Sequence, residues 1–177
     1  SITGVGFQPD WVWVKDRSAA NSNQISDVLR GATKTWFTDA AAAENTDAQR
    51  LTSFDSDGFS VGTNSSWNTN SNNYVSWNWK AGNMNTTVTV SANTTAGFSI
   101  VTWTGSGNTT YNTIGHGLGV APKWVMVKNL TDAQAGTYSL TELGWTKALD
   151  ISSMGASNSS TTYWNDTAPS SSVVTLG

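Results

Sequence analysis

The residues with the clearest potential for chemistry are two acidic side chains in the segment FDSDGF, Asp55 and Asp57. Alternating carboxylates at the start of a loop are typical of calcium sites, because both can point at one hard cation. No Glu follows at the twelfth position of such a loop, and Asp-Gly between two apolar runs is the strongest short signal for a β-hairpin. The segment is therefore predicted to be a hairpin turn, with a calcium site as the alternative.

Groups that could catalyse a reaction are few. The chain has no Cys and one His, His116, which stands between glycines in GHGLG. A His-dependent mechanism needs a nucleophile and an orienting carboxylate, and the spacing places neither, so His116 is predicted to be a turn residue. A glycosidase needs two paired carboxyl groups, but Glu44 and Glu142 have no visible partner. We expect no catalytic residue, no enzyme activity and no cofactor, with calcium as the one alternative.

Tryptophan is the residue type that most favours binding, since the chain has ten and an indole ring can stack on the apolar face of a sugar ring. Those that lie in segments of alternating pattern are predicted mainly to face the core: Trp11, Trp13, Trp77, Trp79, Trp103 and Trp124. Three others lie among polar residues and are predicted to be more exposed, which makes them the candidates for ligand or subunit contact: Trp67, Trp145 and Trp164.

The composition limits the partners. Only 12% of the residues are charged, the formal net charge is −3, and no basic stretch occurs, so nucleic acid is not an expected partner. No apolar segment approaches the roughly 20 residues that span a bilayer, so membrane insertion is not expected. A polar, weakly charged and aromatic-rich chain is typical of β proteins that are secreted or lie on a virion surface.

The elements that must position these residues are predicted to be short strands. Apolar residues alternate with a period of two in 11–15, 74–80 and 100–103. Turn-forming Gly, Asn, Asp and Ser residues separate these runs, as in DSDG, GSGN and GHGLG. The pattern predicts an all-β sandwich of antiparallel sheets.

The chain also repeats itself. QPDWVWVK at 8–15 matches APKWVMVK at 121–128 in five of eight positions, and at the same offset RGATK at 30–34 matches LGWTK at 143–147. When two more residues are allowed in the second copy, GFSVG at 58–62 falls on VVTLG at 173–177. The order of the matches predicts two copies of one domain, at 1–83 and 96–177, with 84–95 as a linker or as an edge strand that turns Val88 and Val90 inward.

Each predicted copy lacks one strand. The first continues into YVSWNWKAG at 74–82, which has no counterpart in the second, and the second opens with GFSIVTWTG at 97–105, which has none in the first. A sandwich without a strand exposes an unpaired edge. We therefore expect that the second copy is truncated within a longer polypeptide, or that neighbouring subunits supply the missing strands.

The ordered motifs GFQPDWVWVKDRS, LTSFDSDGFSVG, YVSWNWKAG, GFSIVTWTG and TIGHGLGVAPKWVMVKN resemble a repeat domain found in tail-fibre and other virion proteins of bacteriophages, those of marine and cyanobacterial phages above all. The resemblance spans almost the whole chain. It implies tandem jelly-roll sandwiches of the concanavalin-A-like or laminin-G-like type.

The same resemblance implies a location on the virion and a structural or host-attachment role without a reaction. The implied partners are copies of the chain itself, other virion proteins and a host surface glycan. The alternative is a capsid decoration or fibre-assembly module that subunit contacts hold and that meets no receptor. A cellular, secreted lectin-like protein is a third possibility, and it would require a signal peptide upstream of Ser1.

Overall fold

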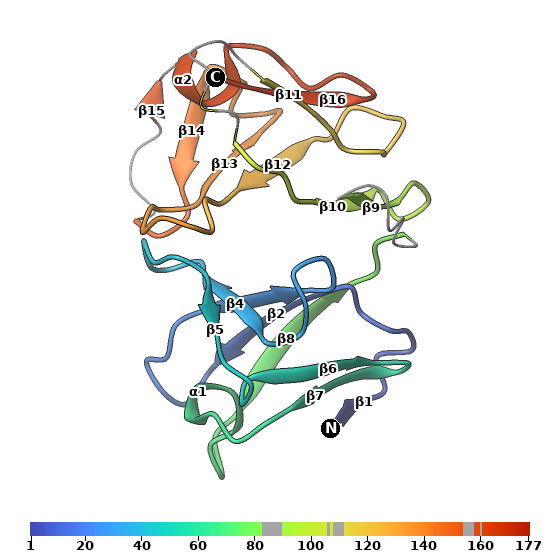
Figure 1. Ribbon diagram of the computed structural model, residues 1–177, viewed down its shortest axis with the longest axis vertical. Helices are drawn as coiled ribbons and strands as arrows, with labels where there is room; N and C mark the ends of the chain where they lie inside the picture. The colour runs from blue at the N-terminus through green and yellow to red at the C-terminus, as the bar shows by residue number, and fades with distance from the viewer. Residues whose placement is uncertain (83–89, 106, 108–111, 154–157, 160) are drawn as a thin grey trace. The chain divides into compact units, whose positions relative to one another are not determined.

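The computed structural model describes residues 1–82, 90–105, 107, 112–153, 158–159 and 161–177 (Figure 1). The chain divides into two compact units. Unit 1 comprises Ser1–Ala81 with Asn129–Gln134, and unit 2 comprises Gly82–Lys128 with Ala135–Gly177. Within the described residues, no helix has the length and apolarity that a membrane crossing requires.

Unit 1 consists of two antiparallel sheets and one short helix. The five-stranded sheet has the order β5-β4-β3-β2-β8 and the three-stranded sheet the order β1-β7-β6 (Figure 1). The elements are β1 (Ile2–Thr3), β2 (Trp11–Asp16), β3 (Gln24–Asp27), β4 (Lys34–Phe37), β5 (Asn45–Thr46), β6 (Leu51–Asp55), β7 (Gly58–Val61), α1 (Ser65–Asn68) and β8 (Tyr74–Trp79).

Unit 2 contains a four-stranded sheet of order β12-β13-β14-β15 and two strand pairs, β11-β16 and β9-β10, all antiparallel. The elements are β9 (Val90–Asn93), β10 (Phe98–Val101), β11 (Asn112–Gly115), β12 (Trp124–Val127), β13 (Thr137–Leu140), β14 (Lys147–Asp150), β15 (Asn158–Ser159), α2 (Thr161–Trp164) and β16 (Val173–Leu176).

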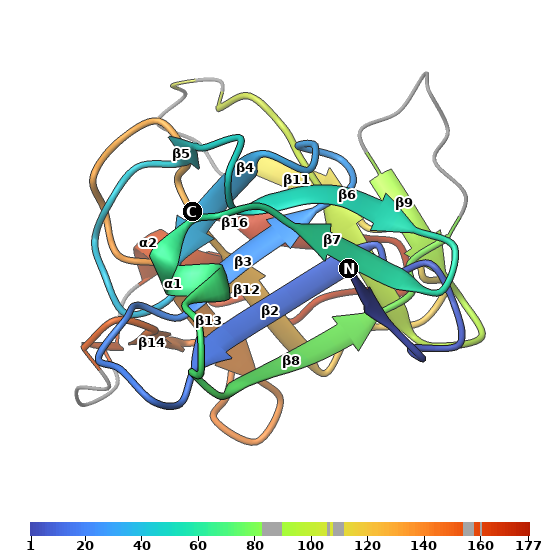
Figure 2. The same ribbon diagram turned by 90° about the horizontal axis from the view of Figure 1, so that it is seen from below.

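Both units bury one face of their larger sheet. In unit 1, Val12 and Val14 of β2 pack against Leu51 of β6, Phe59 of β7 and Trp67 of α1, and Figure 2 shows β6 and β7 lying across β2 and β3. In unit 2 the corresponding core consists of Trp145, Ala148, Trp164 and Val174, with Val125 and Val127 packed against it. The all-β class predicted from the alternation is confirmed.

The ladders of the two larger sheets have the same register. Each pair of residues that face each other in β12–β15 is found by adding 113 to both members of a pair in β2–β5. Examples are Val12↔Ser26 with Val125↔Ser139, Ile25↔Trp36 with Tyr138↔Leu149, and Lys34↔Thr46 with Lys147↔Ser159. The offset found in the sequence thus reappears in the backbone hydrogen-bond pattern.

The segment between the two sequence repeats is partly strand. Val90–Asn93 forms β9, which pairs with β10 from Asn93↔Phe98 to Val90↔Val101, and the side chain of Val90 is half-buried. The first part of the predicted linker, with Val88, lies outside the described residues. The hairpin predicted at DSDG is confirmed, because Asp55 of β6 faces Gly58 of β7 across a two-residue turn.

Candidate functional site

The three tryptophans expected to be exposed are buried. Trp67 is 3%, Trp145 9% and Trp164 1% exposed, so the expectation that they offer their rings to a ligand is wrong. α1 and α2 have only four residues each, and each turns one indole from a polar segment into a core. The indole N–H of Trp67 donates to Gln24 Oε1 at 2.7 Å, and that of Trp164 donates to the backbone oxygen of Lys147 at 3.1 Å.

Asp55 and Asp57, the two residues of the calcium alternative, accept hydrogen bonds from neighbouring segments of the chain. The Asp57 carboxylate accepts hydrogen bonds from the backbone N–H groups of Gly4 and Gly6, at 3.0 and 2.6 Å. The Asp55 carboxylate accepts bonds from the hydroxyls of Ser53 and Ser60, at 2.7 and 2.6 Å. These bonds lower the pKa of both carboxyl groups. Within the described ranges no three His, Asp or Glu side chains form a group that could hold a metal ion.

His116 is 4% exposed and both ring nitrogens are engaged. Nδ1 accepts a hydrogen bond from the backbone N–H of Leu118 at 3.2 Å, and Nε2 lies 3.2 Å from the backbone oxygen of Ser170. A neutral ring with its proton on Nε2 satisfies both contacts. The imidazole therefore joins the segment before β12 to the segment before β16.

The two glutamates lie in different surroundings. Glu44 makes an ion pair with Arg30 at 2.9 Å and a longer one with Lys34 at 3.5 Å, and Arg30 also pairs with Asp27. Glu142 is exposed on the segment after β13. The Arg30 cluster ties the end of β3 to the segment before β5, which is a structural task.

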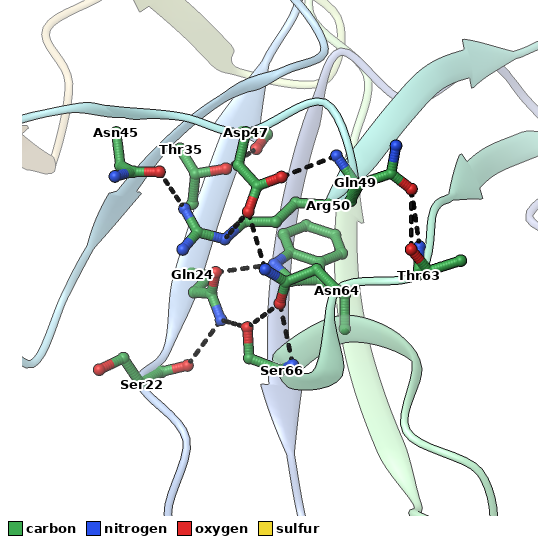
Figure 3. Close-up of polar contacts among 12 residues, drawn as sticks. Ser22, Gln24, Thr35, Asn45, Asp47, Gln49, Arg50, Thr63, Asn64 and Ser66 are labelled. Atoms are coloured by element: carbon green, nitrogen blue, oxygen red, sulfur yellow. Dashed lines mark hydrogen bonds and ion pairs between the residues drawn. The ribbon is translucent and has the colours of Figure 1, made fainter.

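A partly buried polar network joins α1 to the five-stranded sheet (Figure 3). Gln24 Nε2 donates to Ser66 Oγ at 3.0 Å, Ser66 Oγ donates to Asn64 Oδ1 at 2.6 Å, and Asn64 Nδ2 donates to Asp47 Oδ2 at 2.8 Å. The hydrogen bond that the backbone N–H of Gln49 donates to the Asp47 carboxylate is the main reason why the pKa of Asp47 is lowered. Because each member bonds to the next, the network holds Trp67 in place and leaves little for a ligand.

Arg50 stands at the end of this network. Its Nη1 donates to Asn45 Oδ1 at 2.7 Å, its guanidinium lies 5.3 Å from the ring centre of Phe37, and its Nε is 3.7 Å from Asp47 Oδ2. That separation is too long for a hydrogen bond, and the Nε is buried without one. Arg50 thus packs against the sheet while its charge offsets that of Asp47.

The candidate binding surface is the face of β2 and β8 that is turned away from the core. Trp11 faces Trp79 and Trp13 faces Trp77 in the register of the two strands. Successive residues of a strand point to opposite faces, and the core residues of β2 are Val12 and Val14. The four indoles therefore lie on the other face, which we call the tryptophan face.

The tryptophan face is partly open. Trp77 is 46% exposed, and Trp11, Trp13 and Trp79 are half-buried. Trp77 lies beside Trp13, with ring centres 5.7 Å apart and planes tilted by 56°. The expectation that the tryptophans of alternating segments mainly face the core is wrong for these four.

One polar atom on this face has no hydrogen-bond partner among the described residues. It is the indole nitrogen of Trp13, which is buried. A buried tryptophan N–H usually finds an acceptor, since leaving one unpaired costs about 1–3 kcal/mol. An oxygen atom of a ligand that approaches beside Trp77 could accept this hydrogen bond.

Unit 2 carries a reduced version of the same face. Trp124 stands in the place of Trp11 and is 46% exposed, with its ring edge-on to Tyr138 at 6.5 Å. Met126 stands in the place of Trp13, so a counterpart of the tilted Trp13–Trp77 indole pair is absent from this position. Trp103, after β10, is also exposed.

A signal for the tryptophan face is present in the sequence repeat. Val12 and Val14 recur as Val125 and Val127, whereas Trp13 is replaced by Met126. Positions that keep their residue in both copies are expected to be the core positions, and the alternating positions are then the outer ones. This comparison places Trp13 on the outer face but leaves Trp11 undecided, because Trp11 recurs as Trp124.

A family model described as "Domain of unknown function (DUF7483)" matches residues 1–177. No curated protein matches the chain, and no solved structure matches it.

Proposed function

The chain belongs to the DUF7483 family, and we propose that it is a non-enzymatic structural protein of a bacteriophage virion, a tail-fibre or host-attachment module that binds surface glycans of the host. The resemblance of its ordered motifs to virion repeat domains supports this proposal, as does the shared register of its two larger sheets. The two units would be tandem copies of a jelly-roll domain. Its partners would be copies of itself and other virion proteins.

The observation that carries the glycan-binding part is the pair Trp13 and Trp77. Trp77 presents an exposed ring at the edge strand β8, which is where a sugar ring could stack. The Trp13 ring lies beside it, with ring centres 5.7 Å apart, and its buried N–H, which has no partner among the described residues, would bond to a sugar hydroxyl when the exposed Trp77 ring shifts to admit one. An apolar ring face beside one fixed donor is a suitable chemistry for carbohydrates, which present apolar C–H faces and hydroxyl groups together.

The proposal is tested by titrating the full chain against purified bacterial surface polysaccharides, with binding followed by calorimetry. Trp77→Ala should weaken binding about 30-fold, the loss expected when an aromatic anchor worth about 2 kcal/mol is removed. Trp124→Ala is the matched control, because it removes an equally exposed tryptophan from unit 2, and it should change binding by less than about twofold. Equal losses in both variants would contradict the assignment to the tryptophan face.

The alternative is a decoration or fibre-assembly module in which the exposed tryptophans meet neighbouring subunits. The exposed ring of Trp124 on an edge strand favours this role. It predicts self-association that Trp77→Ala or Trp124→Ala abolishes, with no binding to any polysaccharide. Turnover of a polysaccharide that Glu142→Gln removes would contradict both functions.

A further inference from the structure

Strand β12 lies at the edge of its sheet, although its equivalent in unit 1 does not. In unit 1, β2 lies between β3 and β8. In unit 2, β12 pairs with β13, and in the described part of the chain no strand pairs with its other side. Since β12–β15 repeat the register of β2–β5, the position corresponding to β8 is defined but unfilled among these residues.

The backbone groups on the open side of β12 can be identified. The backbone N–H of Thr141 donates to the oxygen of Lys123, as that of Val28 donates to the oxygen of Asp10 in unit 1. Because hydrogen-bonded residues alternate along an antiparallel strand, Val125 and Val127 bond toward β13. The N–H and C=O groups of Trp124 and Met126 therefore face the open side.

Within β12 itself this edge lacks the devices that usually protect one, although Pro122, Lys123 and Lys128 flank the strand. Edge strands are normally blunted by charged residues, proline or a bulge, but Trp124–Val127 reads WVMV and its ladder with β13 is regular. Trp124 also leaves 46% of its surface exposed. An uncharged, regular and partly exposed edge strand is a good template for another strand.

The structure of unit 1 specifies what would fit. The β8 segment YVSWNW contains no charged residue and pairs with β2 over six residues, from Trp11↔Trp79 to Asp16↔Tyr74. Shifted by 113, this register sets Trp124 opposite a residue of the Trp79 type and Met126 opposite one of the Trp77 type. Met126 is narrower and more flexible than the tryptophan it replaces, so it can adapt to a facing indole.

We propose that β12 is a strand-acceptor site for a β8-type strand supplied by a repeat outside residues 1–177, antiparallel and in the register of β2 with β8; the β8 of this chain is not the donor, because it pairs with β2. The site joins repeats by backbone hydrogen bonds and specifies the donor strand by its alternating aromatic residues. It is independent of the proposed glycan binding, because it lies on unit 2 and uses the backbone of the edge.

The test uses the full chain and a fluorescein-labelled peptide of residues 72–82, NNYVSWNWKAG. Anisotropy should rise and saturate as the chain is added. N-methylation of a peptide residue removes its backbone N–H, so it should weaken binding only where that N–H points toward β12. The backbone N–H of Arg17 donates to the oxygen of Asn73, which places Trp77 among the residues that bond toward the acceptor strand and Asn78 among those that bond away from it.

N-methylation at Trp77 should therefore weaken binding at least tenfold, because it removes a hydrogen bond and adds a methyl group to the interface. N-methylation at Asn78 is the matched control and should change binding by less than about twofold. Equal affinity of the two methylated peptides, or no saturable binding of the unmodified one, overturns the proposal.

The position of the binding site is tested by changing β12 itself. Met126→Pro removes one outward N–H and leaves the groups that bond to β13, so it should weaken peptide binding at least tenfold. If this variant does not fold, hydrogen exchange on the unmodified chain gives the same information. The peptide should slow exchange at the backbone amides of Trp124 and Met126, and protection at β2 or β8 instead would show binding elsewhere and overturn the proposal.

Discussion

The hydrogen bond between Gln24 and Trp67 should make a measurable contribution to the stability of unit 1. Both side chains are almost fully buried, at 2% and 3% exposure, and the bond is 2.7 Å long. Gln24→Met keeps a side chain of similar length but removes the acceptor, so the indole N–H is left unpaired. The expected loss in the free energy of unfolding is about 1–3 kcal/mol.

Trp67→Phe should cost about 2–3 kcal/mol, since it leaves a void in the core and an unpaired Gln24 carbonyl. The double variant should cost less than the sum of the single variants by about 1–2 kcal/mol, because each substitution removes the group that the other leaves unpaired. Urea unfolding followed by circular dichroism at equal protein concentration gives the three values.

Trp164→Phe combined with Gln24→Met provides the control for this cycle. Trp164 lies in unit 2 and donates to a backbone oxygen of Lys147, so its effect should add to that of Gln24→Met within about 0.5 kcal/mol. Additive losses in the Gln24 and Trp67 pair would refute the reasoning, because they would mean that the buried bond contributes nothing beyond the packing of its two side chains.

Two further predictions concern the β6–β7 hairpin. Gly58→Ala should lower stability by about 1–3 kcal/mol and speed hydrogen exchange in β1, because an added Cβ would lie 2.0 Å from the backbone oxygen of Ile2. Gly97→Ala, at another positive φ but in open space, should cost only about 1–2 kcal/mol and leave exchange in β1 unchanged. Asp57→Asn should lower the melting temperature at pH 7, since the N–H groups of Gly6 and Gly4 lower the pKa of the native carboxyl. Its stabilising effect is present above the unfolded-state pKa of about 3.9 and is lost as the pH falls through the lower native value. The difference between the variant and the parent should therefore narrow from pH 4 to pH 2, and a difference that stays constant would contradict this assignment.

The strands and the hairpin could be predicted because their signals are local. The alternation at 11–15 and 74–80 describes one strand each, and DSDG at 55–58 consists of turn-forming residues. The offset of the repeat was equally accessible, since it needs only a comparison of the chain with itself. These features required no knowledge of which segments meet in space.

The direction in which a side chain points could not be predicted in the same way. Alternation separates Trp13 from Val14 but does not say which of them faces the core, and the answer depends on β6, β7 and α1 packing on the valine side. Trp67 has serine and asparagine neighbours, yet a helix of one turn buries it and a glutamine from β3 pairs with its indole. Both outcomes depend on partners more than 35 residues away in the chain.

The shared ladder of the two larger sheets separates what holds the backbone from what the surface displays. Trp13 on the tryptophan face occupies the same position as Met126, and the facing pairs are unchanged although the two side chains differ in size and shape. A sheet organised in this way can exchange the chemistry of its outer positions while its pairing stays constant. For a protein that must follow changing surfaces, such tolerance would allow new contacts to be sampled without a new fold.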